Sequence, residues 1–244
     1  MKDMAVLLEN RRNLRHVIAS RLGHVAQLLT IQDKMTGRRL LVANTHLFYH
    51  PLASHIRLMQ MYVLCRQVGR ELTVANAAIT SNSDDNDNTN DKDDCLVMMC
   101  GDFNSSLTTT AGRLATERNV PANFRDVQEH LRTFQWGKRR TAETGTVSVT
   151  QITSSTATAA TASATIADDF PETSLPDNFP VLLPALTEIP SFTHYISGFL
   201  GALDHILIGQ PGLRPVRHAP MPAVRDVARQ TAMPCRVNNC PVIT

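Results

Sequence analysis

The sequence lacks the features that would place it in several large classes of protein. No run of about 18 apolar residues occurs in its 244 residues, so we expect no membrane-spanning helix. The formal net charge is only +2, so the charge balance does not indicate a nucleic-acid-binding protein, although an RNA contact confined to one site stays possible. The N-terminus has no apolar core of a secretory signal, which leaves an intracellular location, cytoplasmic or mitochondrial, as the expectation.

Cysteine pairing motifs are also absent. The five cysteines form an odd set without a CxxC pair: Cys65, Cys95, Cys100, Cys235 and Cys240. Cys95 and Cys100 lie in or beside an apolar run, where a reduced thiol in the core is favoured over a disulfide. This pattern indicates a reducing compartment.

The chain is long enough for one domain with a core, and 43% of its residues are hydrophobic. The order of its predicted elements, a strand pair, a helix, a strand, an insert and a strand, indicates a mixed α/β domain. Periodicity and turn residues predict strands at 22–32 and 39–47 joined by a turn with Gly37, a helix from Ser54 to about Ala78 with Ser54 as N-cap, and buried strands at 95–100 and 202–208. The last strand carries Asp204 near its centre.

Two biased segments interrupt this single domain of residues 1–244. Residues 79–94 are acidic and of low complexity, and they lack the Gly and the bidentate Glu of a calcium loop. Residues 138–185 are rich in Thr, Ala and Ser without a sustained period. Both are predicted to be long disordered inserts.

Polar residues stand in apolar strand contexts at three places. They are Asn44 and His46 in "VANTHLFYHP", Asp102 and Asn104 in "CGDFNSS", and Asp204 in "ALDHILI". A carboxylate at the end of a strand costs desolvation unless a cation, a histidine or backbone donors pair with it. If the strand continues, Asp102 and Asn104 share a face, where their oxygens suit Mg²⁺. An Asx turn that closes the strand explains the pair equally well.

Taken together, "VANTHLFYHPLASHIRLMQM", "CGDFNS" and "SGFLGALDHILI" resemble the endonuclease/exonuclease/phosphatase superfamily, and within it the 2′,5′-phosphodiesterase 12 and deadenylase-like branch. The resemblance covers most of residues 20–136 and 186–235. It implies a four-layer sandwich of two mixed β-sheets flanked by helices. It also implies hydrolysis of oligoadenylate or poly(A) RNA that depends on Mg²⁺ or Mn²⁺, with 2′,5′ and 3′,5′ linkages both open.

The resemblance further implies roles for individual residues. Asp102 would orient or deprotonate the attacking water near the metal, and Asn104 would bind metal-associated water or the scissile phosphate. His46 would donate to a nonbridging phosphate oxygen, and Asp204 would orient a catalytic histidine. The implied metal ligands are therefore Asp102 and Asn104, and the implied substrate-binding residues are Asn44, His46, Asn104 and His50. For His50 a surface or capping role is an alternative, and His205 is expected to be structural on the opposite face from Asp204.

Two features of this superfamily do not match. Its metal-binding Glu in an early "QE" motif has no counterpart here, and the C-terminal "AMPCRVNNCPVIT" carries Asn239 and Cys240 where a Ser-Asp-His segment is expected. We therefore expect a member truncated at both ends, with weak metal binding and an exposed edge or apolar face. Two alternatives remain: a catalytically impaired RNA-binding or interaction module, and a hydrolase of another nucleotide or an inositol-type phosphate.

Overall fold

The computed structural model describes residues 18, 20, 22–80, 94–134, 170–186, 188–196, 199–219 and 222–227. The chain divides into two compact units, Met1–Arg214 and Pro215–Thr244, and the elements below belong to the first. Most of the acidic insert, residues 138–169 of the second insert, and both C-terminal cysteines lie outside the described residues.

An antiparallel hairpin begins the first unit, as the sequence predicts. Strands β1 (Ala26–Gln32) and β2 (Arg39–His46) pair along their whole lengths. The carboxylate of Asp33 accepts a hydrogen bond from the backbone N–H of Met35 in the connecting turn. Gly37 has φ +74°, a left-handed conformation that glycine adopts without a steric cost.

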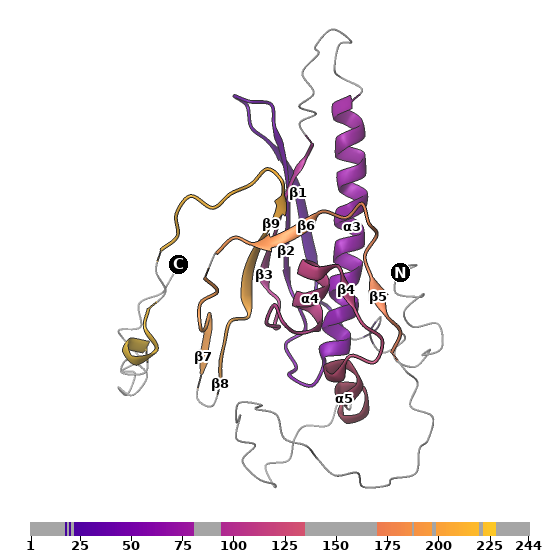
Figure 1. Cartoon of the computed structure of the whole chain (residues 1–244), viewed down its shortest axis with the longest axis vertical. Helices are drawn as coiled ribbons and strands as arrows, with labels where there is room; N and C mark the ends of the chain where they lie inside the picture. The colour runs from indigo at the N-terminus through magenta and orange to yellow at the C-terminus, as the bar shows by residue number, and fades with distance from the viewer. Residues whose placement is uncertain are drawn as a thin grey trace. The chain divides into compact units, whose positions relative to one another are not determined.

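A five-stranded mixed sheet grows from this hairpin in the order β1-β2-β3-β9-β6. β3 (Leu96–Asp102) lies parallel to β2, while β9 (Asp204–Gln210) and β6 (Val181–Pro184) continue the sheet with antiparallel pairing. The long helix α3 (Ser54–Thr80) connects the two parallel strands and covers one face of the sheet, as Figure 1 shows. The structure thereby confirms the mixed α/β class.

The core lies between this sheet and the helices. Alternate residues of a strand face opposite sides, so Leu41 and Ala43 of β2 and Met99 of β3 are buried toward α3, which contributes Ile56 and Met59 in return. Both methionines are fully buried and fill the core, as the helical spacing predicts. None of the helices in the described ranges has the length and hydropathy to cross a bilayer.

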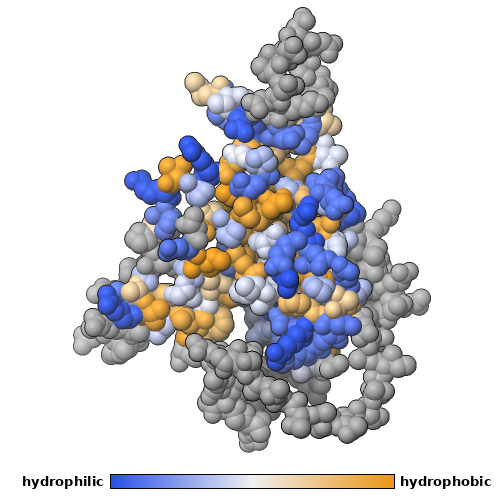
Figure 2. All heavy atoms as spheres, viewed as in Figure 1, coloured by the Kyte–Doolittle hydropathy of each residue, from blue (hydrophilic) through white to orange (hydrophobic). Residues whose placement is uncertain are grey.

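The other face of the sheet is open and partly apolar. Its exposed large hydrophobic residues are Leu29, Ile31, Val181, Leu183 and Ile206. Figure 2 shows hydrophobic side chains at the surface in the region of β6 and β9. This agrees with the expected exposed apolar face. The described residues form one five-stranded mixed sheet with helices and two two-stranded pairs, and they do not form the expected second mixed sheet.

Smaller elements complete the unit: α4 (Thr110–Glu117), β4 (Asn119–Val120) paired with β5 (Thr173–Ser174), α5 (Arg125–Thr133), and β7 (His194–Ile196) paired with β8 (Phe199–Gly201). β5 and β6 fall within the predicted insert 138–185, so regular structure begins earlier than the sequence indicates. Apolar anchors explain the difference, because Phe170, Phe179 and Leu182 are buried in the core.

Two local predictions also change. Asp204 is the first residue of β9 and not a central one, which places it at the edge of the sheet. Ser54 begins α3, but its hydroxyl hydrogen bonds to the carbonyl of Asp126 and contacts Nδ1 of His130. The side chain therefore joins α3 to α5 and does not cap its own helix.

Candidate active site

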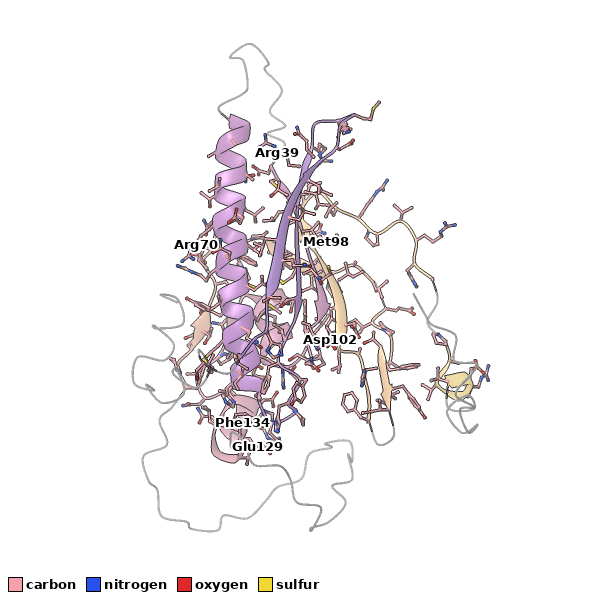
Figure 3. The ribbon with its side chains drawn as sticks, turned by 180° about the vertical axis from the view of Figure 1, so that it is seen from behind. Arg39, Arg70, Met98, Asp102, Glu129 and Phe134 are labelled. Carbon is pink, nitrogen blue, oxygen red and sulfur yellow. The ribbon has the colours of Figure 1, made fainter. Side chains whose placement is uncertain are left out.

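Three strand ends meet at one edge of the sheet and bring the predicted residues together. β2 and β3 are parallel and end in His46 and Asp102, which are register partners. β9 is antiparallel to β3 and begins at Asp204, the partner of Asp102. The row of His46, Asp102 and Asp204 is named here the rim. Figure 3 shows Asp102 at the end of β3, beyond Met98 and away from Arg39.

The rim faces the open side of the sheet. His46 alternates with buried Thr45, and His205, next to Asp204, is buried on the helix side. The side chain of His46 is 66% exposed and that of Asp102 is 27% exposed, and Nε2 of His46 lies 3.6 Å from Oδ2 of Asp102. Solvent and a ligand can therefore reach both groups from one direction.

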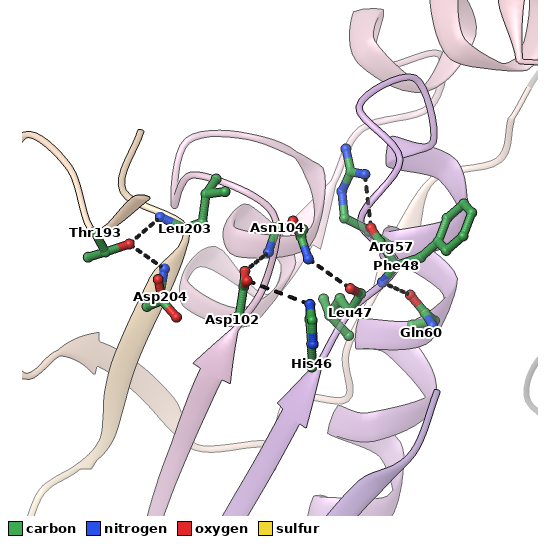
Figure 4. Close-up of polar contacts among 10 residues, drawn as sticks. All are labelled: His46, Leu47, Phe48, Arg57, Gln60, Asp102, Asn104, Thr193, Leu203 and Asp204. Carbon is green, nitrogen blue, oxygen red and sulfur yellow. Dashed lines mark hydrogen bonds and ion pairs between the residues drawn. The ribbon is translucent and has the colours of Figure 1, made fainter. Parts of the chain in front are cut away.

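Asn104 reaches the rim through a turn and not through continued strand geometry. β3 ends at Asp102, and Asn104 has φ +47°. Its backbone N–H donates to Oδ1 of Asp102 at 2.8 Å, and its Nδ2 donates to the carbonyl of Leu47 at 2.9 Å. The Asx turn that the sequence allows is therefore observed, and it leaves Oδ1 of Asn104 as the available atom of its carboxamide (Figure 4). That this oxygen binds a metal ion stays a prediction.

Gly101 allows the two motifs to approach each other. It has φ +135°, and a Cβ atom there would overlap the carbonyl of Thr45 on β2. The backbone N–H of Leu47 then donates to the carbonyl of Asp102 at 2.9 Å. A side chain at position 101 would separate β2 from β3 where the rim is formed.

Asp204 is supported by a residue that the sequence did not single out. Oγ1 of Thr193 accepts hydrogen bonds from the backbone N–H groups of Leu203 and Asp204, each at 2.9 Å. The carbonyl of Leu203 accepts a bond from the N–H of Phe103 at 2.8 Å. The start of β9 is thereby tied to the loop that carries Asn104.

The remaining histidines differ in accessibility. His205 is buried, its Nε2 lies 2.8 Å from the carbonyl of Ser105, and desolvation lowers its pKa despite that bond and nearby carboxylates. His50 is half-buried, its Nδ1 accepts from the N–H of Leu52, and burial followed by the charge of Arg57 lowers its pKa. His24, missed in the sequence, lies edge-on to His46 with ring centroids 6.3 Å apart.

Asn44 lies one alternation before His46 on the same face of β2. Its Nδ2 donates to Oε1 of Gln27 at 3.4 Å, and Sγ of Cys100 lies 3.8 Å from its Oδ1. The side chain therefore borders the rim from the open face. Its predicted contact with substrate stays a prediction.

The oxygen atoms of the rim suit a hard cation in type but not in number. Asp102 and Asn104 offer carboxylate and carboxamide oxygens, and Asp204 adds a second carboxylate beside Asp102, where a cation would relieve like-charge repulsion. Within the described ranges, however, no three residues among His, Cys, Asp and Glu are grouped as a metal site. The residues therefore fit Mg²⁺ that keeps much of its water, as this ion commonly does.

No protein-family model matches the chain. Among curated proteins it is similar to 2′,5′-phosphodiesterase 12 of Homo sapiens, 26% identical over 211 residues that cover 86% of this chain and 26% of that protein. It is 24% identical to the CCR4-Not complex 3′-5′-exoribonuclease subunit Ccr4 of Aspergillus niger over 117 residues, 44% of this chain and 18% of that protein.

Among solved structures, ANGEL2, described as a 2′,3′-cyclic phosphatase, in complex with adenosine-2′,3′-vanadate shares 20% identity and a TM-score of 0.43 over 76% of this chain and 49% of that one. The chain spans about a quarter (26%) of the length of the 2′,5′-phosphodiesterase 12 sequences that it matches. The curated relatives bear out the resemblance that the sequence motifs indicate, because the chain is similar to 2′,5′-phosphodiesterase 12 and, over a shorter stretch, to a CCR4-Not exoribonuclease subunit.

Proposed function

We propose that the chain carries the hydrolytic site of a Mg²⁺-dependent phosphodiesterase, a 3′-exoribonuclease that cleaves oligoadenylate or poly(A) RNA by in-line attack of water. The observation that carries this proposal is the convergence of His46, Asp102 and Asn104, from two separate motifs, with Asp204 alongside. Two relatives, a 2′,5′-phosphodiesterase and a 3′-5′-exoribonuclease, support the same chemistry. The four-layer sandwich of the superfamily belongs to the proposal as well.

The proposed roles follow from which atoms are already engaged. Oδ1 of Asp102 accepts the N–H of Asn104, so Oδ2 is the atom that orients an attacking water or takes its proton. Nε2 of His46 lies 3.6 Å from this Oδ2, where an N–H group can donate to a nonbridging phosphate oxygen as negative charge develops. Asp102 thus acts on the attacking water, and His46 acts on the negative charge that develops on the phosphate.

Mg²⁺ would be held by Asp102 and Asn104 and would supply electrostatic stabilisation of the phosphate and of the leaving oxygen. Asp204 would orient a histidine. His205 does not serve, because it is buried on the other face of the sheet.

One observation favours a second candidate, a non-catalytic RNA-binding or interaction module. Among the described residues, no three side chains of the His, Cys, Asp or Glu type are grouped so that they could hold a metal ion, those of the rim included. Such a module would keep the shape of the site and bind RNA without turnover.

Release of AMP from 2′,5′-linked and 3′,5′-linked oligoadenylate distinguishes the two. The purified chain is assayed with Mg²⁺ and with EDTA, beside Asp102→Asn and the charge-matched control Asp177→Asn. Asp177 is exposed, and its backbone carbonyl, not its carboxylate, accepts the bond from Arg118. The assay requires that each variant be shown to fold.

Metal-dependent release that is lost in Asp102→Asn and kept in Asp177→Asn would support the hydrolase, and the preferred linkage would name the substrate. Loss of a general base typically lowers the rate by about 10²- to 10⁴-fold. RNA binding with equal, background release from all three folded proteins would reject the hydrolase in favour of the binding module. Faster release of phosphate from an inositol phosphate than of AMP would change the substrate class.

A further inference from the structure

The buried guanidinium of Arg57 is the least expected side chain near the rim. Arg57 lies in the first turns of α3 and is only 6% exposed. Arginine is rarely buried to this degree without partners, because removing a cation from water is costly. Burial lowers the pKa of Arg57 to about 10, opposed by the charge of Asp126, so the group is still a cation at neutral pH.

Four acceptors surround this cation, and they come from the two segments that carry the site. Nη1 donates to the carbonyls of Phe48 at 3.2 Å and His50 at 2.6 Å, and Nη2 donates to the carbonyl of Pro51 at 3.3 Å. Nε donates to Oγ of Ser105 at 3.1 Å. Figure 4 shows the contact with Phe48 beside His46 and Asp102.

Both segments are directly continuous with the rim. Phe48 follows Leu47, whose carbonyl holds the carboxamide of Asn104, and Ser105 follows Asn104 itself. The N–H of Phe48 donates to Oε1 of Gln60, one turn after Arg57 on the same helix. Arg57 and Gln60 therefore hold the turn of residues 47–51 at its carbonyl and N–H groups.

A role in packing alone does not explain an arginine here. Residues 48–50 have no regular secondary structure, and the carbonyls of Phe48, His50 and Pro51 accept bonds from the guanidinium. An apolar side chain at position 57 would remove these bonds and leave the carbonyl of His50 with the N–H of Ala53 alone. Lysine presents a single point charge and could not match a planar fork that reaches four acceptors. The structure thus uses the guanidinium to set the backbone of two loops at once.

We propose that Arg57 is a positioning residue, which fixes the turn of residues 47–51 against the loop of residues 103–105. His46 and Asn104 are thereby held against Asp102 before a ligand binds. That this arrangement serves hydrolysis rests on the proposed function. The arrangement of His46 and Asn104 against Asp102 is itself a property of the folded chain and can be measured without turnover.

The test compares Arg57→Lys and Arg57→Met with Arg70→Met. Arg70 lies on the same helix and is exposed, with a 3.4 Å bond to Gln67 (Figure 3). Amide hydrogen exchange is measured at Leu47 and Asn104, whose N–H groups bond to Asp102, and at Met99 in the centre of the sheet as the reference.

Arg57→Met is expected to speed exchange at Asn104 and Leu47 by about 10- to 100-fold relative to Met99, the equivalent of one charge-assisted hydrogen bond. Arg57→Lys should give a smaller change and Arg70→Met none. If Arg57→Met does not fold, Arg57→Lys alone decides.

Equal acceleration at all three amides would show a contribution to overall stability only, and unchanged exchange would show no contribution; either result overturns the proposal. Where AMP is released, Arg57→Lys should lower kcat with little change in KM. If the wild-type chain releases no AMP, the proposed hydrolase is refuted, and hydrogen exchange alone then tests the positioning role of Arg57.

Discussion

Replacing Gly101 with alanine is the most direct test of how the rim is built. Two separate penalties apply at this position. The backbone φ of +135° lies where residues other than glycine are strained, and the added Cβ would overlap the carbonyl of Thr45. Because that carbonyl belongs to the neighbouring strand, relief requires β2 and β3 to move apart beside His46 and Asp102.

The expected magnitude is the sum of both effects. The strained backbone costs about 1–3 kcal/mol, and overlap with backbone that cannot rotate away adds about 1–3 kcal/mol. A loss of about 3 kcal/mol in the free energy of unfolding corresponds to a fall in Tm of about 6–12 °C for a chain of this size. Circular dichroism during urea unfolding measures the change in the free energy of unfolding, and circular dichroism during thermal unfolding measures the change in Tm.

Two other glycines separate the penalties. Gly37 has φ +74°, but a Cβ there would meet only the side-chain Nε2 of Gln32, at an ordinary contact distance of 3.9 Å, so Gly37→Ala should cost only about 1 kcal/mol. Gly23 has neither a φ in the left-handed range nor any atom within 4 Å, so Gly23→Ala should change stability by about 0.5 kcal/mol or less. A Gly101→Ala variant as stable as Gly23→Ala would refute this account of the close approach between β2 and β3.

Three further predictions concern protonation, packing and metal. Desolvation lowers the pKa of His205 in the folded chain, so below about pH 6.5 the unfolded chain binds a proton at this group that the folded chain does not bind. The free energy of unfolding should therefore decrease as the pH is lowered below about 6.5, by at most about 1.4 kcal/mol per pH unit from this group. His205→Gln should reduce this pH dependence in urea melts. Ser54→Ala removes the bonds of the hydroxyl to Asp126 and His130 and should cost about 1–2 kcal/mol in the same melts. Mg²⁺ at ten times its Kd should stabilise the wild type by about 1.4 kcal/mol, and Asp102→Asn should lose this gain in thermal melts.

The second and third of these have a matched control. Ser106→Ala removes a hydroxyl that bonds only to the exposed side chain of Thr108, and should be nearly neutral. Asp177→Asn should keep the stabilisation by Mg²⁺. An unchanged pH slope in His205→Gln, a neutral Ser54→Ala, or equal Mg²⁺ shifts in both aspartate variants would contradict the respective argument.

The local elements follow from short-range patterns in the sequence. Alternation around Gly37 predicts the hairpin, helical spacing from Ser54 predicts α3, and apolar runs predict β3 and β9, each within a few residues of its observed bounds. The motif residues His46, Asp102 and Asn104 were also identifiable, because polar side chains at the ends of apolar strands are conspicuous. The predicted insert 138–185 ended too late, since the buried anchors after Phe170 show no period that a local pattern could detect.

The sequence by itself thus determined the helix, the strands and the chemical types at the site. Only the tertiary structure decided that β9 begins at Asp204 and pairs it with Asp102, that Thr193 supports this strand end, and that Asn104 arrives through an Asx turn. It also decided that Arg57 turns inward to bond two loops. The physical reason is that propensity and periodicity depend on neighbours in sequence, whereas register and buried hydrogen bonds depend on groups that become neighbours only when the sheet forms.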